Sequence, residues 1–414
     1  NLFALLALIV SAVMFALAEP LVKLVYHGFP AEKIALTAEL TRIMVLALVF
    51  NVASIAVSNM LNAMEKYIAA QLAGFPLSLC VIVASVAFSG RFGIRAVAWG
   101  VFAANILQLL ILIPFLKGWF RYTPELNLRD ERFKTLAKLS LPAMLSMGVS
   151  ELNHMIDHAL ASGLPEGTLT SMTSAYRLIT FLQGILIVPL TTIMFSKMSV
   201  KVAENDERGA LKMFKKSATT LLMFVLPIVG IGAVLSVDVI KFAYMRGKFT
   251  LEDVNVTAGI LLFYIVGLPA FGMRDFLSRM FHALKDTKTP FRVSCMVVAI
   301  NIVLNFILRA VMGANGLAFA TSIAGYCGTA AMIILLRKRF GRIRLKRTAI
   351  ELAKILTATA ISVVVCIVMN RIIPDTVGTI KVMLRLMLCA VVSLIAYAAS
   401  AYALRVRALR SVMK

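Results

Sequence analysis

Residues 148–184 read GVSELNHMIDHALASGLPEGTLTSMTSAYRLITFLQG and predict two apolar helices joined by a short turn at 162–167. Polar side chains are concentrated on both helices: Glu151, Asn153, His154, Asp157 and His158 on the first, and Ser171, Thr173, Ser174, Tyr176, Arg177, Thr180 and Gln183 on the second. A charged group at membrane depth costs several kcal/mol unless it faces a cavity or a partner. The stretch therefore predicts a helical membrane protein with a functional site in this hairpin.

Arg177 is the deepest charge of the hairpin. If its helix begins near Thr168, a rise of about 1.5 Å per residue places Arg177 roughly 14 Å along the helix, near the middle of a hydrocarbon core about 30 Å thick. Two interpretations stay open. The guanidinium lines a polar cavity, or it pairs with a helix carbonyl or with Asp157 inside the protein.

The composition supports the membrane interpretation. Hydrophobic residues make up 60% of the chain and the mean hydropathy is +0.90, whereas a soluble domain is about half apolar. The net charge of +23 does not indicate a nucleic-acid partner, because the basic residues lie between apolar runs without interleaved aromatic residues. The five cysteines are isolated in apolar runs and have neither a disulfide framework nor metal-ligand spacing.

Apolar runs of membrane-spanning length recur along the chain. They predict twelve helices, at 1–26, 36–61, 70–89, 94–117, 135–160, 168–196, 217–240, 253–280, 290–309, 315–336, 348–372 and 379–404. An all-α, polytopic membrane fold with both ends of this sequence on one side of the membrane follows from this even number of spans.

The distribution of Lys and Arg predicts the orientation. Most of these 43 residues lie in alternate loops, including 118–134, 197–216 and 337–347, which the positive-inside rule makes cytoplasmic. The segment 197–216 is amphipathic and is predicted to lie along the membrane interface. Within the spans, Arg42, Arg274, Lys354 and Arg385 are close enough to the span ends to extend toward the interface, whereas Arg177 is not.

The first helix of the hairpin presents two polar faces. Glu151, His154 and His158 share one face at helical spacing, which permits either a transition-metal site or a satisfied polar network. Asn153 and Asp157 share the other face.

Asp157 has candidate partners elsewhere in the chain. Asn301 and Asn305 are four residues apart on a predicted helix, and Thr321 lies one turn into the next helix. A carboxylate, two amide oxygens and a hydroxyl suit a small hard cation such as Na⁺, and no other metal is expected. Interhelical hydrogen bonding without an ion is the alternative.

Motifs of known enzymes do not occur in the sequence. It has no G-x-S-x-G, no P-loop, no H-E-x-x-H, and no acidic cluster in a cytoplasmic loop to hold Mg²⁺ for diphosphate chemistry. We therefore expect a protein that is not an enzyme and needs no cofactor beyond a coupling ion.

Four stretches carry a resemblance to a known family. LASGLPEGTLTSMTSAYRL at 160–178, RGKFT at 246–250 and FHALKDTKTP at 281–290, together with NIVLN at 301–305, resemble the lipid II flippases of the MurJ (MviN) family. This resemblance implies the multidrug/oligosaccharidyl-lipid/polysaccharide (MOP) exporter fold, with two helical lobes around a central cationic cavity and a C-terminal helix pair that forms a groove for the lipid tail.

The resemblance also implies a domain organisation. Residues 1–117 would form an incomplete N-lobe of four spans, 118–134 a cytoplasmic loop, 135–336 the C-lobe of six spans, 337–347 a basic cytoplasmic loop, and 348–414 the helix pair with a basic tail. The predicted spans would correspond to family helices three to fourteen, so two N-terminal helices are expected to lie outside this sequence.

Site residues follow from the matched motifs. Arg177 matches the family's cavity arginine, and Tyr176, Gln183 and Arg42 are further candidate substrate-binding residues. Asp157, Asn301, Asn305 and Thr321 match positions that resemble a sodium site. Tyr176 stands where the family usually has an acidic residue, so the local charge balance of the cavity is expected to differ.

The predicted function is translocation of lipid II, an undecaprenyl-diphosphate-linked muropeptide, from the inner to the outer leaflet for peptidoglycan synthesis. Alternating access would move the head group, and Na⁺ entry would reset the cycle. Alternatives are another MOP-fold transporter, either a polysaccharide-lipid flippase or a drug exporter, a membrane enzyme acting on polyprenyl diphosphates, and an inactive scaffold. A multi-pass location in the bacterial plasma membrane is expected, with lipid II and membrane lipid as partners.

Overall fold

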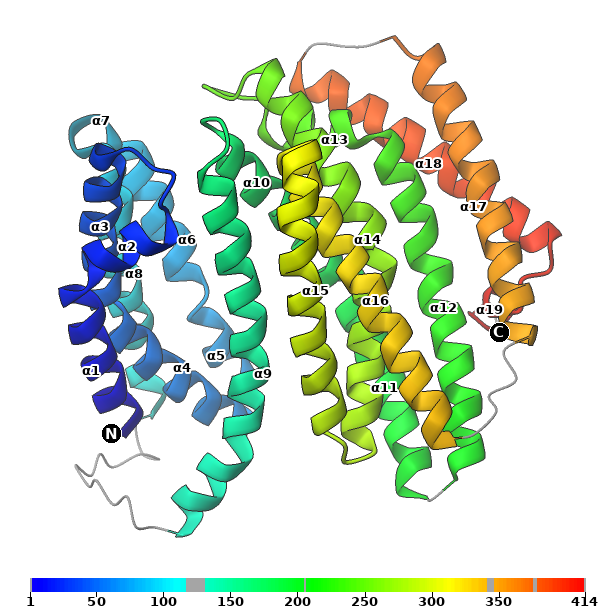
Figure 1. Cartoon of the computed structure of the whole chain (residues 1–414), viewed down its shortest axis with the longest axis horizontal. Coiled ribbons are helices and arrows are strands. Elements are labelled where there is room, and N and C mark those ends of the chain that lie inside the picture. Colours follow the sequence, from blue (N-terminus) through cyan, green and yellow to red (C-terminus); the bar gives the residue numbers. More distant parts are fainter. Residues whose placement is uncertain (1, 117–130, 205, 341–345, 375–377, 413–414) are drawn as a thin grey trace. The chain divides into compact units, whose positions relative to one another are not determined.

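Helices account for all the regular secondary structure in the residues that the computed structural model of the chain describes, 2–116, 131–204, 206–340, 346–374 and 378–412 (Figure 1). The chain divides into two compact units, Asn1–Ser140 and Leu141–Lys414. The all-α prediction is confirmed for this part of the chain. Residues 117–130 and 341–345, which include most of the predicted cytoplasmic loop 118–134 and part of the loop 337–347, lie outside the described residues.

The first unit is built from short and long apolar helices. They are α1 (Leu2–Ala16), α2 (Ala18–Val25), α3 (Ala31–Leu46), α4 (Leu48–Ala63), α5 (Tyr67–Leu72), α6 (Phe75–Val83), a π-helical turn (Ala84–Phe88), α7 (Ser89–Phe92), α8 (Ile94–Leu112) and a 3₁₀ turn (Ile113–Leu116). The chain bends by 72° between α1 and α2. Leu61, Ala69, Ala70, Leu112 and Leu116 form a small buried core.

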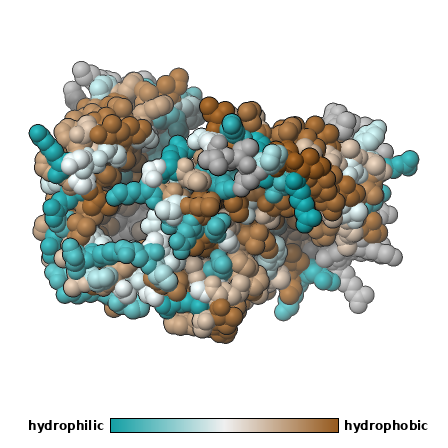
Figure 2. Space-filling view, turned by 90° about the horizontal axis from the view of Figure 1, so that it is seen from above, coloured by the Kyte–Doolittle hydropathy of each residue, from teal (hydrophilic) through white to brown (hydrophobic). Residues whose placement is uncertain are grey.

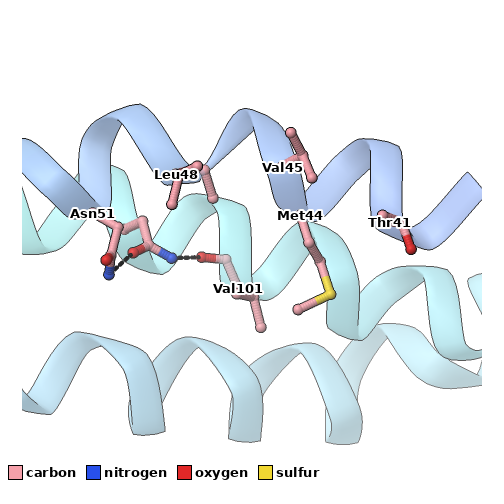
Figure 3. A pocket seen from close by; sticks show the side chains of 8 residues that line it. Thr41, Met44, Val45, Leu48, Asn51 and Val101 are labelled. Atoms are coloured by element: carbon pink, nitrogen blue, oxygen red, sulfur yellow. Dashed lines mark hydrogen bonds between the residues drawn. The ribbon is translucent and has the colours of Figure 1, made fainter. Parts of the chain in front are cut away.

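A pocket lies between α3, α4 and α8 of this unit (Figure 3). Its lining is mostly apolar and consists of Thr41, Met44, Val45, Ala47, Leu48, Asn51, Val101 and Asn105. The amide of Asn51 donates to Oδ1 of Asn105 at 2.8 Å, and the Asn105 amide donates to the carbonyl of Val101 at 2.8 Å. Amide pairs of this kind hold neighbouring membrane helices together. Arg42, a candidate substrate-binding residue, is half-buried on α3 and is not among the lining residues.

The second unit is arranged around one long buried helix. Its elements are α9 (Glu131–Ser162, which begins in the first unit), α10 (Thr168–Leu182), a π-helical turn (Gln183–Ile187), α11 (Val188–Ala203), α12 (Glu207–Val234), α13 (Ser236–Tyr244), α14 (Leu251–Ala283), α15 (Lys288–Met312), α16 (Ala314–Phe340), α17 (Lys346–Ile372), α18 (Thr379–Ala403) and α19 (Arg407–Val412). Helix α14 contacts α10, α11, α12, α13 and α16. It buries Ile260, Leu268 and Phe276 completely, as expected of a helix that is apolar on all sides.

The last helix pair packs on α12 and α13. The hydroxyl of Tyr397 on α18 donates to the carbonyl of Met223 on α12 at 2.7 Å, and Ser362 on α17 donates to the carbonyl of Ser393 at 2.7 Å. Both contacts are buried: the first attaches α18 to α12, and the second holds α17 and α18 together.

Apolar side chains cover the outer helices. Val303, Phe306 and Ile307 on α15, and Leu384, Leu388 and Ile395 on α18, are exposed. Exposed apolar surface of this extent indicates contact with lipid rather than water. Figure 2 views the chain from the end where the α9–α10 turn lies, and hydrophilic residues there are interspersed with hydrophobic ones.

Ten helices in the described residues are long and apolar enough to cross a membrane, or up to eleven if α1 and α2 form one bent span. Helices occur at all twelve predicted positions, and the difference lies in α9. This helix is 32 residues long, but Glu151, Asn153, His154 and Asp157 lower its hydropathy. The same residues that predict the functional site therefore remove α9 from the spans identified by composition.

The structure corrects the prediction for 197–216. Helix α11 continues to Ala203, and α12 begins at Glu207 after Asp206, whose Oδ1 accepts a hydrogen bond from the Gly209 amide at 2.8 Å. Phe214 is buried, and Leu211 packs against the same core. The prediction of an interfacial helix was wrong because the apolar residues of this segment cover the protein core rather than the membrane surface.

The 281–290 motif forms the turn between α14 and α15. The carboxylate of Asp286 accepts hydrogen bonds from the Thr289 amide at 3.0 Å and the Thr289 hydroxyl at 2.7 Å, and it lies 3.6 Å from Arg339 of α16. Partial burial raises the pKa of Asp286, but the Thr289 hydrogen bonds and the Arg339 charge outweigh it and hold the pKa below its ordinary value. The motif is thus a charged structural turn that joins three helices.

Candidate functional site

The polar hairpin predicted from the sequence is formed by α9 and α10. Its turn is closed by hydrogen bonds from the Leu164 amide to the Ala161 carbonyl at 3.0 Å and from the Thr168 amide to the Pro165 carbonyl at 3.2 Å. Gly167 has a φ of 87°, in the left-handed region that glycine adopts without strain. This residue lets the chain reverse and begin α10 at Thr168.

Asp157 lies in a buried cluster with both predicted asparagines. Its side chain accepts a hydrogen bond from Nδ2 of Asn305 at 2.6 Å, and Nδ2 of Asn153 lies 3.4 Å from its other oxygen. Asn305 also donates to Asn301 at 2.9 Å, and Asn301 donates to the Thr321 hydroxyl at 3.2 Å. Asp157, Asn301 and Asn305 are 3%, 1% and 0% exposed, so the cluster is shielded from solvent. The structure brings together all four residues of the candidate cation site, from α9, α15 and α16.

Two features allow the hydrogen bonds of this cluster to rearrange. Oδ1 of Asn305 is buried and has no hydrogen-bond partner among the described residues. The Asn301 amide also fits when turned over, donating to Asp157 at 3.1 Å and to Oδ1 of Asn153 at 2.9 Å. Buried polar atoms are normally paired, and an orphaned oxygen beside a carboxylate is the donor set that a small cation uses. The residues therefore fit Na⁺ chemically, whereas the hydrogen bonds present also fit the alternative of interhelical bonding.

A transition-metal site at Glu151, His154 and His158 finds no support. Over the part of the chain that the structure describes, no group of three or more His, Cys, Asp or Glu side chains is placed to hold a metal ion. Glu151 is exposed, while Nε2 of His154 lies 2.9 Å from the hydroxyl of Tyr176 on α10. The ring of His154 packs against Tyr176 rather than facing a common ligand point.

Arg177 is exposed on α10, next to the half-buried Tyr176. Its guanidinium has no hydrogen-bond or ion-pair partner among the described residues, so the proposed pairing with Asp157 or a helix carbonyl is not present in that part of the chain. Tyr176 points instead toward His154. Gln183, the fourth candidate substrate-binding residue, is half-buried and begins the π-helical turn.

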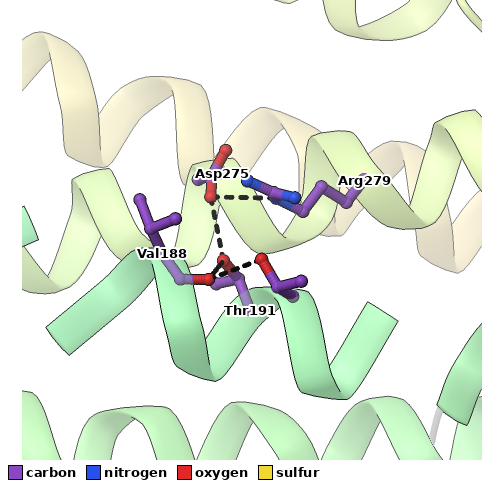
Figure 4. Close-up of polar contacts among 5 residues, drawn as sticks. Val188, Thr191, Asp275 and Arg279 are labelled. Atoms are coloured by element: carbon purple, nitrogen blue, oxygen red, sulfur yellow. Dashed lines mark hydrogen bonds and ion pairs between the residues drawn. The ribbon is translucent and has the colours of Figure 1, made fainter. Parts of the chain in front are cut away.

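The π-helical turn separates α10 from α11 within one predicted span, and Pro189 follows in the first turn of α11. Beyond it, the Thr191 hydroxyl lies 3.2 Å from Oδ2 of Asp275 on α14, which also accepts a hydrogen bond from Nε of Arg279 at 3.1 Å (Figure 4). Helix α11 is thereby tied to the central helix. π turns inside α-helices are frequent at functional sites.

Comparison with known proteins assigns the chain to a family. The family model described as "Lipid II flippase MurJ" matches residues 1–388. The chain belongs to the lipid II flippase MurJ family. The family resemblance inferred from 160–178, 246–250 and 281–290 is therefore confirmed, and with ten candidate spans the chain is a multi-pass membrane protein.

Two bacterial relatives, each named probable lipid II flippase MurJ, show how much of the family the chain covers. The protein from Rhizobium tropici is 29% identical over 82% of this chain and 65% of its own length, and the one from Thermotoga maritima is 32% identical over 78% and 63%. The chain thus spans slightly less than two thirds of the length of these MurJ relatives.

Solved structures show the same fold. A lipid II flippase MurJ in an inward closed conformation superposes with a TM-score of 0.82 at 25% identity, over 98% of this chain and 83% of that one. An inward-facing multidrug-resistance MATE transporter of the MOP superfamily has a TM-score of 0.67 at 16% identity, over 81% and 79%. The MATE likeness shows the fold alone, and with the MurJ match it confirms the predicted MOP architecture.

One buried ion pair was missed by sequence reasoning. Arg385 on α18 is 8% exposed, with Nη1 3.3 Å from Oδ1 of Asp238 on α13. Its Nη2 donates to the carbonyl and the side-chain oxygen of Asn370 at 3.0 and 2.8 Å. The prediction that Arg385 extends to the membrane interface was wrong, because a buried acid and an amide lie within its reach. Asp238 lies 147 positions before Arg385, so the pair has no local sequence signal.

Proposed function

We propose that this chain translocates lipid II, a polyprenyl-diphosphate-linked muropeptide, from the inner to the outer leaflet. Family membership supports the substrate class. The observation that carries the proposal is Arg177, an exposed cation on a membrane helix with no partner among the described residues. A guanidinium binds phosphate oxygens through two parallel hydrogen bonds, so a diphosphate is the natural partner. A cationic drug would be repelled by the same residue.

The direct test uses cells whose own flippase can be switched off. Expression of this protein is expected to restore growth and to make the lipid-linked precursor accessible to a membrane-impermeant enzyme added outside spheroplasts. Normal abundance in the membrane without either effect would contradict the proposed function. An effect on drug resistance in place of precursor access would favour the drug-exporter alternative.

The orientation is tested by single-cysteine labelling in a variant that lacks the five native cysteines. Because most Lys and Arg residues lie in the loops on one side, cysteines placed in 118–134 and 337–347 are expected to resist an impermeant reagent in intact cells. Pro165→Cys in the α9–α10 turn is expected to be labelled and serves as the control. Labelling of both loops from outside would reverse the orientation and with it the proposed direction.

Na⁺ is the proposed coupling ion, held by Asp157, Asn301, Asn305 and Thr321. Asp157→Ala is expected to abolish the Na⁺-dependent stabilisation of the purified protein, because the carboxylate is the only charged ligand of the four. Binding stabilises by about 2.7 kcal/mol at a hundredfold excess over Kd, a shift that thermal unfolding in NaCl against choline chloride would measure. Glu151→Ala, on the same helix but exposed, should respond to Na⁺ like the parent. Equal Na⁺ responses of Asp157→Ala and the parent would remove the site.

A further inference from the structure

The cation cluster and Arg177 lie on neighbouring helices of one hairpin. His154 precedes Asp157 by three residues on α9, so the two side chains lie one turn apart on adjoining faces. Tyr176 directly precedes Arg177 on α10. Any movement of α9 at Asp157 therefore moves His154, and any movement of Tyr176 moves Arg177.

One contact joins the two helices at these residues, between His154 of α9 and Tyr176 of α10. The hydroxyl of Tyr176 and Nε2 of His154 are 2.9 Å apart, and their ring centroids are 4.7 Å apart. The Tyr176 ring also meets Tyr264 of the central helix edge-on, at 5.7 Å between centroids. Tyr264 is 4% exposed and belongs to the buried core, so Tyr176 contacts a buried ring of α14 as well as the side chain of His154.

A cation bound at Asp157 would change the surroundings of His154, the α9 residue of this contact. The Asn305 amide now donates to Asp157 at 2.6 Å. A cation needs oxygen ligands, so this amide must turn its buried, unpartnered Oδ1 toward the ion. Asn153 also contacts Asp157, at 3.4 Å, and it is the direct neighbour of His154. Rearrangement of the cluster thus reaches His154 through the adjoining residue.

We propose that the His154–Tyr176 contact couples the cation site to Arg177, so that cation binding at Asp157 changes the affinity of Arg177 for the diphosphate. This inference rests on the proposed function and makes His154 a positioning residue, which touches neither ligand. Coupling between two ligands is reciprocal and typically amounts to 5–150-fold in affinity.

The experiment measures two affinities of the purified protein, for Na⁺ and for farnesyl diphosphate as a soluble polyprenyl diphosphate. Each is determined with and without the other ligand, and choline chloride replaces NaCl at equal ionic strength. In the parent we expect Na⁺ to change the Kd of farnesyl diphosphate at least fivefold. His154→Phe keeps an aromatic ring but loses Nε2, so each ligand should still bind alone while the change falls below about twofold.

Three further single variants and one double variant sharpen the test. His158→Phe is the matched control, since His158 is half-buried one turn further along α9 and no hydrogen-bond partner for it occurs among the described residues. It should keep the parental coupling. His154→Gln retains a hydrogen-bonding group and should restore part of the coupling. Tyr176→Phe removes the other half of the contact, so its coupling should also fall below about twofold whatever its own affinity for the diphosphate, and the double variant should lose no further coupling.

The outcomes distinguish the coupling role of His154 from the proposed function of the protein. Parental coupling in His154→Phe would overturn the inference, as would a parent that binds both ligands independently, while leaving the proposed function intact. Loss of diphosphate binding by His154→Phe alone would make His154 part of the binding site rather than a link. A parent that binds no farnesyl diphosphate would contradict the proposed function itself.

Discussion

If this protein has the proposed flippase function, replacing Arg177 with alanine is expected to abolish growth of cells that depend on it alone, while the variant still reaches the membrane in normal amount. The guanidinium is exposed and without a partner among the described residues, so its removal leaves no group unpaired in that part of the chain. A diphosphate would lose two hydrogen bonds to a charged donor. At about 1.5–3 kcal/mol each, that amounts to more than a hundredfold in affinity.

Two variants separate a ligand role of Arg177 from a general effect of charge. Arg177→Lys is expected to be partly active, because an ammonium keeps the Coulomb attraction but loses the planar fork. Arg292→Ala, which removes an exposed arginine near the start of α15, should grow normally. A structural role of Arg177 predicts low abundance of the alanine variant instead. Normal growth of Arg177→Ala would mean that another group binds the head group.

The second large effect is expected at the buried ion pair. Asp238→Ala should lower the free energy of unfolding by about 3–5 kcal/mol, because it leaves the guanidinium of Arg385 without its acidic partner inside the protein. Asp238 and Arg385 side chains are 6% and 8% exposed, so solvent screens them little. Denaturant titration in mixed micelles would measure the change.

An exposed pair in the same unit provides the comparison. Arg407 is 74% exposed and lies 3.8 Å from Glu351, so Arg407→Ala should cost less than about 1 kcal/mol. Combining Asp238→Leu with Arg385→Met removes both charges at once and should be less destabilising than Asp238→Ala alone. If Asp238→Ala and Arg407→Ala had equal effects, the buried pair would not hold α18 to α13.

Helix positions were predictable because membrane-spanning runs are long and their apolar composition is unambiguous. Interruptions inside these runs were harder to predict. The 168–196 run reads as one helix, yet it contains a π-helical turn at Gln183–Ile187, and the 217–240 run is divided at Leu235. Composition records neither these interruptions nor side-chain contacts such as the one between Thr191 and Asp275.

The candidate site was predictable where residues of one helix share a face. Asn301 and Asn305 are four residues apart, and the family resemblance connected them with Asp157, which the structure places within hydrogen-bonding distance of Asn305. His154 could not be interpreted in this way. The sequence left open a metal ligand or a polar network, and only the fold shows that the residue opposite it is Tyr176.

The π-helical turn also determines how far α10 is rotated about its axis relative to α11. A π turn contains one residue more than an α turn, and one residue corresponds to about 100° around a helix. The side chains of α10 and α11 therefore do not follow one continuous α-helical periodicity, although the two helices together form a single span. With Thr191 held by Asp275, the length of the segment 183–187 sets the direction in which α10 presents Arg177. Inserting or deleting one residue in 183–187 would rotate α10 about its axis by about 100° relative to α11. The side chain of Arg177 would then point in a different direction without any substitution at Arg177 itself.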